Sequence, residues 1–181
     1  AGQIPVFYNH ENGASYDVGT ISAFNSYVDI PHTPRYHFGH GLSYTTFEYS
    51  DLRLNKKKYE PYETLCVSVD IENTGHMAGD EVVQLYIRDP YASMVRPVKE
   101  LAGFKRIWLN PNEKRTITFR IKLSQFAFLD AEMKWKVEAG AMDVLVGSSS
   151  NDIRLHDSFE ITSDLYVDGK TRGFFAETEV Y

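Results

Sequence analysis

Beyond residue 45, apolar and polar residues alternate along most of the chain, which is the pattern of strands with one buried face. The alternating runs are short, and residues that favour turns separate them. The apolar positions of the clearest runs are Leu65, Val67, Val69 and Ile71; Val83, Leu85 and Ile87; Ile117, Phe119, Ile121 and Leu123; Met142, Val144 and Val146; and Ile153, Leu155, Phe159 and Ile161. Helical spacing is almost absent. The pattern predicts an all-β fold, a two-sheet immunoglobulin or fibronectin type III-like sandwich of about seven strands.

The first of these runs contains a change of phase. Phe47 and Tyr49 alternate with polar neighbours, but Leu52 and Leu54 continue on the other phase. An extra residue in a strand shifts its alternation in this way, so we expect a β-bulge near Ser50–Asp51.

The run around residues 83–88 predicts a strand with two different faces. Val83, Leu85 and Ile87 are expected to point into the core, whereas Gln84, Tyr86 and Arg88 are expected to face away from it. The strand is expected to end at Asp89-Pro90, because proline cannot donate a hydrogen bond to a sheet ladder. Further on, residues 110–113 (Asn-Pro-Asn-Glu) have the composition of a turn.

Residues 1–44 do not resemble an independent domain. They are rich in Pro, Gly, Asn and His and contain too few apolar positions for a core, so we expect them to pack on another surface. Glycines on both sides of His40 predict a sharp turn or a close approach of the backbone there. Residues 164–181 form a tail whose Phe174 and Phe175 also suggest docking onto a surface. We therefore divide the chain into 1–44, a sandwich at 45–163, and a C-terminal extension or linker at 164–181.

Charge and cysteine content exclude several classes of protein. The net charge is −6 and no basic tract is present beyond residues 56–58, so binding to a nucleic acid is not expected. The single cysteine, Cys66, excludes an internal disulfide and argues against an antibody-type sandwich. No apolar run approaches the roughly 20 residues of a membrane helix, so we expect no membrane partner.

Side chains that could support chemistry do not cluster in the sequence. His37 and His40 lie three positions apart, but no cysteine or carboxylate pair accompanies them, so neither a metal site nor any cofactor is expected. Acidic pairs such as Asp80-Glu81 fall at strand starts and turns, where a solvated charge is the simplest interpretation.

Several blocks of the sequence, in order, resemble glycoside hydrolase family 3. Residues 36–52 (YHFGHGLSYTTFEYSDL) resemble the segment that enters the C-terminal fibronectin type III-like domain of these enzymes, which are exo-acting β-glucosidases and β-xylosidases. The further blocks are 73–86 (NTGHMAGDEVVQLY), 96–106 (RPVKELAGFKR), 135–140 (WKVEAG) and 144–150 (VLVGSSS). Residues 2–10 (GQIPVFYNH) resemble the end of the family's α/β sandwich domain.

The resemblance implies a retaining β-glycosidase that uses two carboxyl groups, a nucleophile and an acid/base. In the family these groups come from a barrel domain and from an upstream part of the α/β sandwich domain, and no residue of this chain matches either motif. We therefore expect no catalytic residue here, an inactive isolated chain, and the remaining catalytic domains as its partners. The resemblance also suggests contacts from Asn9, His10, Tyr27 and His40 to a β-glucoside or β-xyloside. It is compatible with a soluble enzyme, cytoplasmic or secreted.

A stand-alone sandwich that binds a carbohydrate or a protein is the alternative. Such a module would need exposed aromatic side chains on one strand face, and Tyr86, Tyr91 and Trp108 are the candidates for a stacking platform. Packing in the core or between domains is the other interpretation of these three residues. A row of three outward aromatic residues at period two is not evident in any strand.

Overall fold

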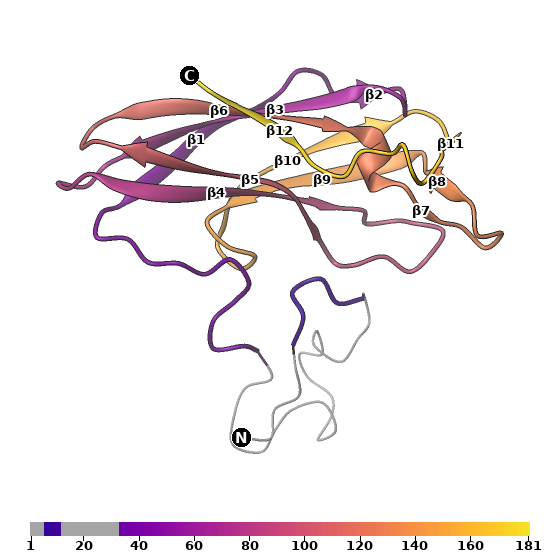
Figure 1. Ribbon diagram of the computed structural model, residues 1–181, viewed down its shortest axis with the longest axis horizontal. Helices are drawn as coiled ribbons and strands as arrows, with labels where there is room; N and C mark the ends of the chain where they lie inside the picture. The colour runs from indigo at the N-terminus through magenta and orange to yellow at the C-terminus, as the bar shows by residue number, and fades with distance from the viewer. Residues whose placement is uncertain (1–5, 12–32) are drawn as a thin grey trace, which may run out of the picture.

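The computed structural model describes residues 6–11 and 33–181, and its main body is a two-layer β-sandwich (Figure 1). One sheet has the strand order β1-β3-β6-β12, and the other has the order β2-β10-β9-β4-β5. The strands of the first sheet are β1 (Phe47–Leu54), β3 (Thr64–Asn73), β6 (Lys114–Lys122) and β12 (Glu177–Val180). Those of the second are β2 (Lys58–Tyr59), β10 (Ile153–Ile161), β9 (Gly140–Gly147), β4 (Gly79–Arg88) and β5 (Glu100–Leu109).

A third, small sheet closes one end of the sandwich. Its order is β11-β8-β7, and it consists of β11 (Leu165–Tyr166), β8 (Trp135–Val137) and β7 (Phe128–Leu129). A single 3-10 turn, η1 (Leu123–Phe126), leads into it from β6. The predicted all-β sandwich is thereby confirmed, with the short strands β2, β7, β11 and β12 added to the predicted ones.

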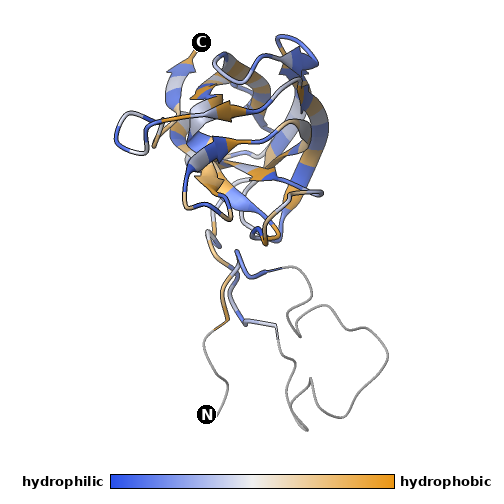
Figure 2. Cartoon of the chain, turned by 90° about the vertical axis from the view of Figure 1, so that its right-hand side faces the viewer, coloured by the Kyte–Doolittle hydropathy of each residue, from blue (hydrophilic) through white to orange (hydrophobic). Residues whose placement is uncertain are grey.

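The core lies between the two large sheets and consists of the predicted inward positions. The strands carry alternating hydrophobic and hydrophilic residues in Figure 2, in keeping with their period of two. The fully buried apolar side chains of the facing strands include Leu65, Val67, Val69, Ile71, Val83, Leu85, Ile117, Phe119, Ile121, Val144 and Val146. Burial of these side chains is the main favourable contribution to folding.

The predicted bulge in β1 is confirmed. The register of β1 against β3 shifts between Ser50 and Arg53. Asp51, which lies in this interval, has a φ of 54°, a left-handed conformation that aspartate tolerates better than most residues. The bulge moves Leu52 and Leu54 onto the face that packs against the core, which accounts for the change of phase in the sequence.

The middle of β4, residues 83–87, is buried on both faces, which the alternation alone did not predict. Gln84 and Tyr86 face away from the space between the sheets, yet they are only 4% and 0% exposed. The N-terminal part of the chain covers them, as described below. A stacking platform that includes Tyr86 is therefore wrong, because its ring is not accessible to a ligand.

The C-terminal tail also joins the sandwich. β11 pairs with β8, and β12 adds to the free side of β6 as an antiparallel strand, so residues 165–180 contribute to two sheets. Figure 1 shows this segment in yellow beside β6. Phe174 and Phe175 lie in the connection between the two strands and are largely exposed.

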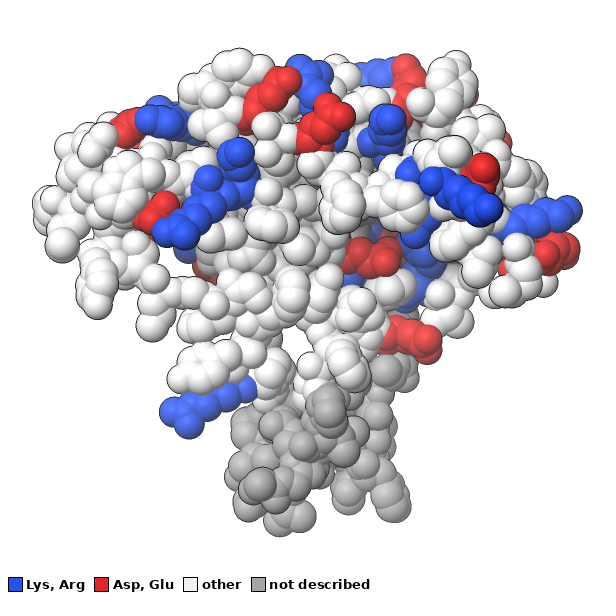
Figure 3. All heavy atoms as spheres, in the orientation of Figure 1, with Lys and Arg blue, Asp and Glu red and all other residues white. Residues whose placement is uncertain are grey.

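Charged side chains of both signs are interspersed over the face of the molecule seen in Figure 3. Within residues 6–11 and 33–181, no three His, Cys, Asp or Glu side chains are grouped in a way that could hold a metal ion. The described part of the chain also contains no helix long and apolar enough to cross a membrane. Cys66 is a partly exposed strand residue whose Sγ lies 3.5 Å from a guanidinium nitrogen of Arg120.

Candidate functional site at the N-terminal junction

Residues 6–11 dock onto the sandwich where β5 begins. The ring of Tyr8 stacks on Phe38 with 4.2 Å between ring centroids and meets the edge of Tyr86 at 5.9 Å. The backbone N–H of Leu101 donates a hydrogen bond to the Tyr8 hydroxyl (3.2 Å), and the N–H of Val98 donates to the carbonyl of His10 (2.8 Å). This part of the N-terminal region therefore packs on another surface, as its composition predicted.

A second segment, the strap (residues 36–44), crosses the outward side of β4. Its predicted turn is present, because the N–H of His40 donates to the carbonyl of His37 at 2.9 Å and Gly39 has a φ of +78°. A Cβ atom on Gly39 would lie 2.1 Å from Oε1 of Gln84. Glycine is required at this position both by the backbone conformation and by the close approach to β4.

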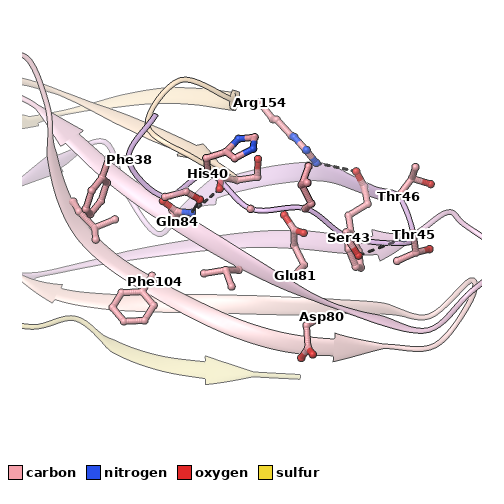
Figure 4. Close-up of a pocket in the computed structure, with 17 residues that line it drawn as sticks. Phe38, His40, Ser43, Thr45, Thr46, Asp80, Glu81, Gln84, Phe104 and Arg154 are labelled. Carbon is pink, nitrogen blue, oxygen red and sulfur yellow. Dashed lines mark hydrogen bonds between the residues drawn. The ribbon is translucent and has the colours of Figure 1, made fainter. Parts of the chain in front are cut away.

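The side-chain amide of Gln84 makes three hydrogen bonds, one of which fixes the strap to the sheet. Its Nε2 donates to the carbonyls of Gly39 (3.1 Å) and Ser148 (2.5 Å), and its Oε1 accepts from the hydroxyl of Tyr86 (2.6 Å). Figure 4 shows the amide pointing toward the strap. A further bond runs from the N–H of Ser150 to the carbonyl of Phe38 (2.9 Å). The strap, β4 and the β9–β10 turn are thus connected through one buried amide.

Between the strap and β4 lies an open cavity of about 620 Å³. Its walls come from the strap, from residues 45–47 at the start of β1, and from β4, β5, the β9–β10 turn and β10, and Figure 4 shows their side chains. The residues that carry polar or aromatic groups into it include Phe38, His40, Ser43, Thr45, Asp80, Glu81, Gln84, Phe104 and Arg154.

A partly buried carboxyl group lies in the wall of this cavity. The Tyr49 hydroxyl donates to Glu81 at 2.6 Å, and burial raises the pKa of both groups above their usual values. The guanidinium of Arg154 lies 4.5 Å from the centre of the Tyr49 ring and donates to the carbonyl of Phe47 (2.9 Å). Interpreting Glu81 as a solvated charge was therefore wrong, whereas Asp80 makes an exposed ion pair with Arg106 (2.6 Å).

A smaller cavity of about 230 Å³ lies on the other side of Phe38. His10, Tyr36 and Lys99 contribute to its lining. The ammonium group of Lys99 donates to the carbonyl of Ser150, and burial lowers the pKa of Lys99. The ammonium group of Lys99 therefore already has a protein partner.

The structure separates the residues for which sugar contacts were expected. His40 lines the larger cavity and His10 the smaller one, while Phe38 contributes to both. Asn9 is exposed next to His10, and Tyr27 lies outside the described residues. Sequence reasoning missed Gln84, because a polar residue on the outward side of a strand gives no sign of what covers it. It also missed Glu81, which has the same phase in β4 as the inward residue Val83, because its charge alone suggested an exposed position.

Comparison with known proteins agrees with this architecture. Residues 81–150 match the model of the fibronectin type III-like domain family. A thermostable β-glucosidase B of Acetivibrio thermocellus is 40% identical over 162 residues, covering 89% of this chain and 22% of the relative. A β-xylosidase of Formosa agariphila is 42% identical over 149 residues, covering 82% of this chain and 20% of the relative.

Solved structures give the same result. The crystal structure of a β-glucosidase from Listeria innocua in complex with glucose superposes with a TM-score of 0.79 at 36% identity, covering 90% of this chain and 23% of that one. The chain spans about a fifth of the length of the curated relatives that it matches. Both the sandwich and the similarity therefore lead to one assignment: the chain belongs to glycoside hydrolase family 3, as a C-terminal part that includes the fibronectin type III-like domain.

Proposed function

We propose that this chain is the supporting C-terminal portion of an exo-acting retaining β-glycosidase that removes terminal β-linked glucose, and also xylose, from its substrates. Residues 45–163 form the supporting sandwich, residues 1–44 enter it from an α/β sandwich domain, and residues 164–181 are its extension. The nucleophile and the acid/base belong to the catalytic domains, which are the partners of this chain.

The junction is the observation that carries this proposal. Residues 6–11 and the strap both pack on the outward side of the second sheet through contacts to β4 and β5. An end segment of a neighbouring domain that is fixed in this way is held in one orientation, which is what a supporting domain must achieve. The relatives are enzymes about five times longer, so the rest of such a protein would supply the chemistry.

An activity assay of the isolated chain tests whether the catalytic groups lie in the other domains. We expect no hydrolysis of an aryl β-glucoside or an aryl β-xyloside, because retaining hydrolysis needs two carboxyl groups about 5–5.5 Å apart, one of them as nucleophile. Turnover that survives repurification would contradict the proposal. In a parent enzyme that contains the catalytic domains, deletion of residues 45–181 should abolish soluble, active protein. Full activity and an unchanged melting temperature after the deletion would refute the supporting role.

Sugar contacts from Asn9, His10, Tyr27 and His40 are part of the same proposal. In the parent enzyme, His40→Ala is expected to raise KM for an aryl β-glucoside about 2- to 10-fold, the loss of roughly one hydrogen bond. His76→Ala, at an exposed histidine between β3 and β4, is the matched control and should leave KM unchanged. Equal effects of the two substitutions would argue against a contact from the strap.

A non-catalytic binding module is the second candidate, because two aromatic side chains project from one face of β5. Phe104 and Trp108 are 61% and 54% exposed, and they lie on the same side of the strand. An affinity gel that contains xylan or a β-glucan tests this candidate. Retardation of the isolated chain that is lost in Trp108→Ala would favour it, and migration identical to that in a plain gel would exclude it.

A further inference from the structure

The last eighteen residues, 164–181, act as a clasp that runs from one end of the sandwich to the free side of β6. Its first part is anchored by β11 on β8 and by a hydrogen bond from the N–H of Val167 to the carbonyl of Trp135 (2.9 Å). Leu165 and Val167 also pack against the core. This part of the clasp is an integral piece of the fold.

A stacked arginine fixes the middle of the clasp. The guanidinium carbon of Arg172 lies 4.3 Å from the ring of Trp135 and 4.7 Å from the ring of Phe174, so the cation contacts two aromatic rings. Its Nη1 donates to the carbonyl of Gln125 (3.2 Å), and the N–H of Gly173 donates to the hydroxyl of Ser124 (3.0 Å). Arg172 thus connects the clasp to η1 and to β8.

The end of the clasp is held by its backbone and by the apolar side chains of Ala176 and Val180, which pack against the core. β12 pairs with β6 from Glu177 opposite Arg120 to Val180 opposite Ile117, and Thr116 and Tyr181 exchange two hydrogen bonds of 3.0 and 2.9 Å. β12 lies at the edge of its sheet. Between Arg172 and β12, residues 173–177 border a cavity of about 580 Å³. The clasp is therefore fixed by Arg172 before this cavity and by β12 after it.

The two strands have complementary charges. β6 reads KRTITFRIK and contains four basic residues and no acidic one, whereas β12 reads ETEV and contains two acidic residues and no basic one. Glu179 makes a forked contact with Arg120, with N–O distances of 3.3 Å. A basic strand with a free edge is suited to an acidic extended segment, because backbone hydrogen bonds give affinity and the side chains give selectivity.

We propose that the edge of β6 is a strand-addition site for an acidic extended segment, filled in cis by residues 177–181 and kept closed by Arg172. When Arg172 no longer holds the clasp, residues 177–181 of a second copy of this chain bind to the edge of β6 instead. Two copies then exchange their C-terminal strands. An uncovered strand edge readily pairs with another chain, which gives the exchange its driving force.

A peptide-binding experiment tests the site. The chain is shortened to residues 1–173, and a fluorescent peptide of residues 174–181 is titrated with it. We expect saturable binding that weakens as salt is added, at least 10-fold weaker binding of the peptide with Glu177→Lys and Glu179→Lys, and no binding to the intact chain. Absence of binding to a folded shortened chain would overturn the proposal. Equal binding of the two peptides, or binding to the intact chain, would also overturn it.

Variants of the intact chain test the same idea when the shortened chain does not fold. Arg172→Ala is expected to give concentration-dependent dimers in light scattering. In an antiparallel ladder, hydrogen-bonded and non-hydrogen-bonded residue pairs alternate. Thr116 and Tyr181 form a hydrogen-bonded pair, so Glu179 and Thr118 form another, whereas Thr178 and Phe119 form a non-hydrogen-bonded pair. Adding Glu179→Pro should therefore abolish the dimers, whereas adding Thr178→Pro should preserve them. An Arg172→Ala chain that stays monomeric, or dimers that persist with Glu179→Pro, would refute strand exchange.

Discussion

Gln84 offers a quantitative test of how the strap is held. Gln84→Ala removes the three hydrogen bonds of the amide and leaves the buried hydroxyl of Tyr86 without a partner. An unsatisfied buried hydroxyl costs about 1–3 kcal/mol, and each lost bond to the carbonyls of Gly39 and Ser148 about 0.5–1.5 kcal/mol before water replaces it. We therefore expect the free energy of unfolding to fall by about 2–6 kcal/mol, with the lower values where water replaces the lost bonds.

A double-mutant cycle with Tyr86→Phe isolates the pair. Tyr86→Phe alone leaves Oε1 of Gln84 unpaired and should cost about 1–2 kcal/mol. In Gln84→Ala/Tyr86→Phe the buried hydroxyl is absent, so the combined cost should be at least about 1 kcal/mol smaller than the sum of the two single changes. Additive effects would mean that the hydroxyl is not buried against the amide.

Urea unfolding of the 181-residue chain, followed by fluorescence, gives these free energies, provided the transition is two-state and the slope is unchanged. Limited proteolysis with chymotrypsin adds a local measurement, because the strap contains exposed aromatic residues such as Tyr36 and Tyr44. Cleavage in the strap should be faster in Gln84→Ala than in the parent. A loss of stability below about 0.5 kcal/mol, with unchanged cleavage, would refute the role given to Gln84.

Three further results are expected. Phe119→Ala, at a fully buried position, should lower the free energy of unfolding by about 3–5 kcal/mol in urea, and a loss below about 1 kcal/mol would contradict its place in the core. Burial raises the pKa of Glu81 above 4.5, so the stability that its protonated form contributes is lost as the pH rises through that pKa. Glu81→Gln should therefore raise the free energy of unfolding at pH 7 and change it little at pH 4. Equal effects at both pH values would refute this. Gly39→Ala should speed proteolysis of the strap because its Cβ meets Gln84, while Gly41→Ala, with open space around it, is the control and should not.

The sandwich could be predicted because its long strands bury one face each. Ile117, Phe119 and Ile121 alternate with polar residues, and burial of one face is what produces such a pattern. The bulge at Asp51 could be predicted for the same reason, since an added residue shifts the alternation.

Features that depend on contacts outside the two-layer core could not be predicted from the alternation of apolar and polar residues. The outward side of β4 was predicted correctly as the other face of the strand, but nothing in the alternation indicated that Tyr8 and the strap would bury Gln84. β12 was missed because it is short and its sequence ETEV, with one apolar residue, carries no apolar period. The alternation along a strand thus indicates which face of its sheet is buried in the core, but it does not indicate which segments cover the other face.

The parallel pairing of β2 with β10 has a consequence for synthesis of the chain. Tyr59, which is fully buried, lies opposite Ile161 in this pair. A ribosome adds about 5–20 residues per second, so the roughly 100 residues between them take about 5–20 s to appear. During that interval the ring of Tyr59 has no partner strand, and neither large sheet has all its strands. The nascent chain must therefore remain soluble while part of its core is uncovered, and the sandwich is complete only when β10 and β12 have left the ribosome.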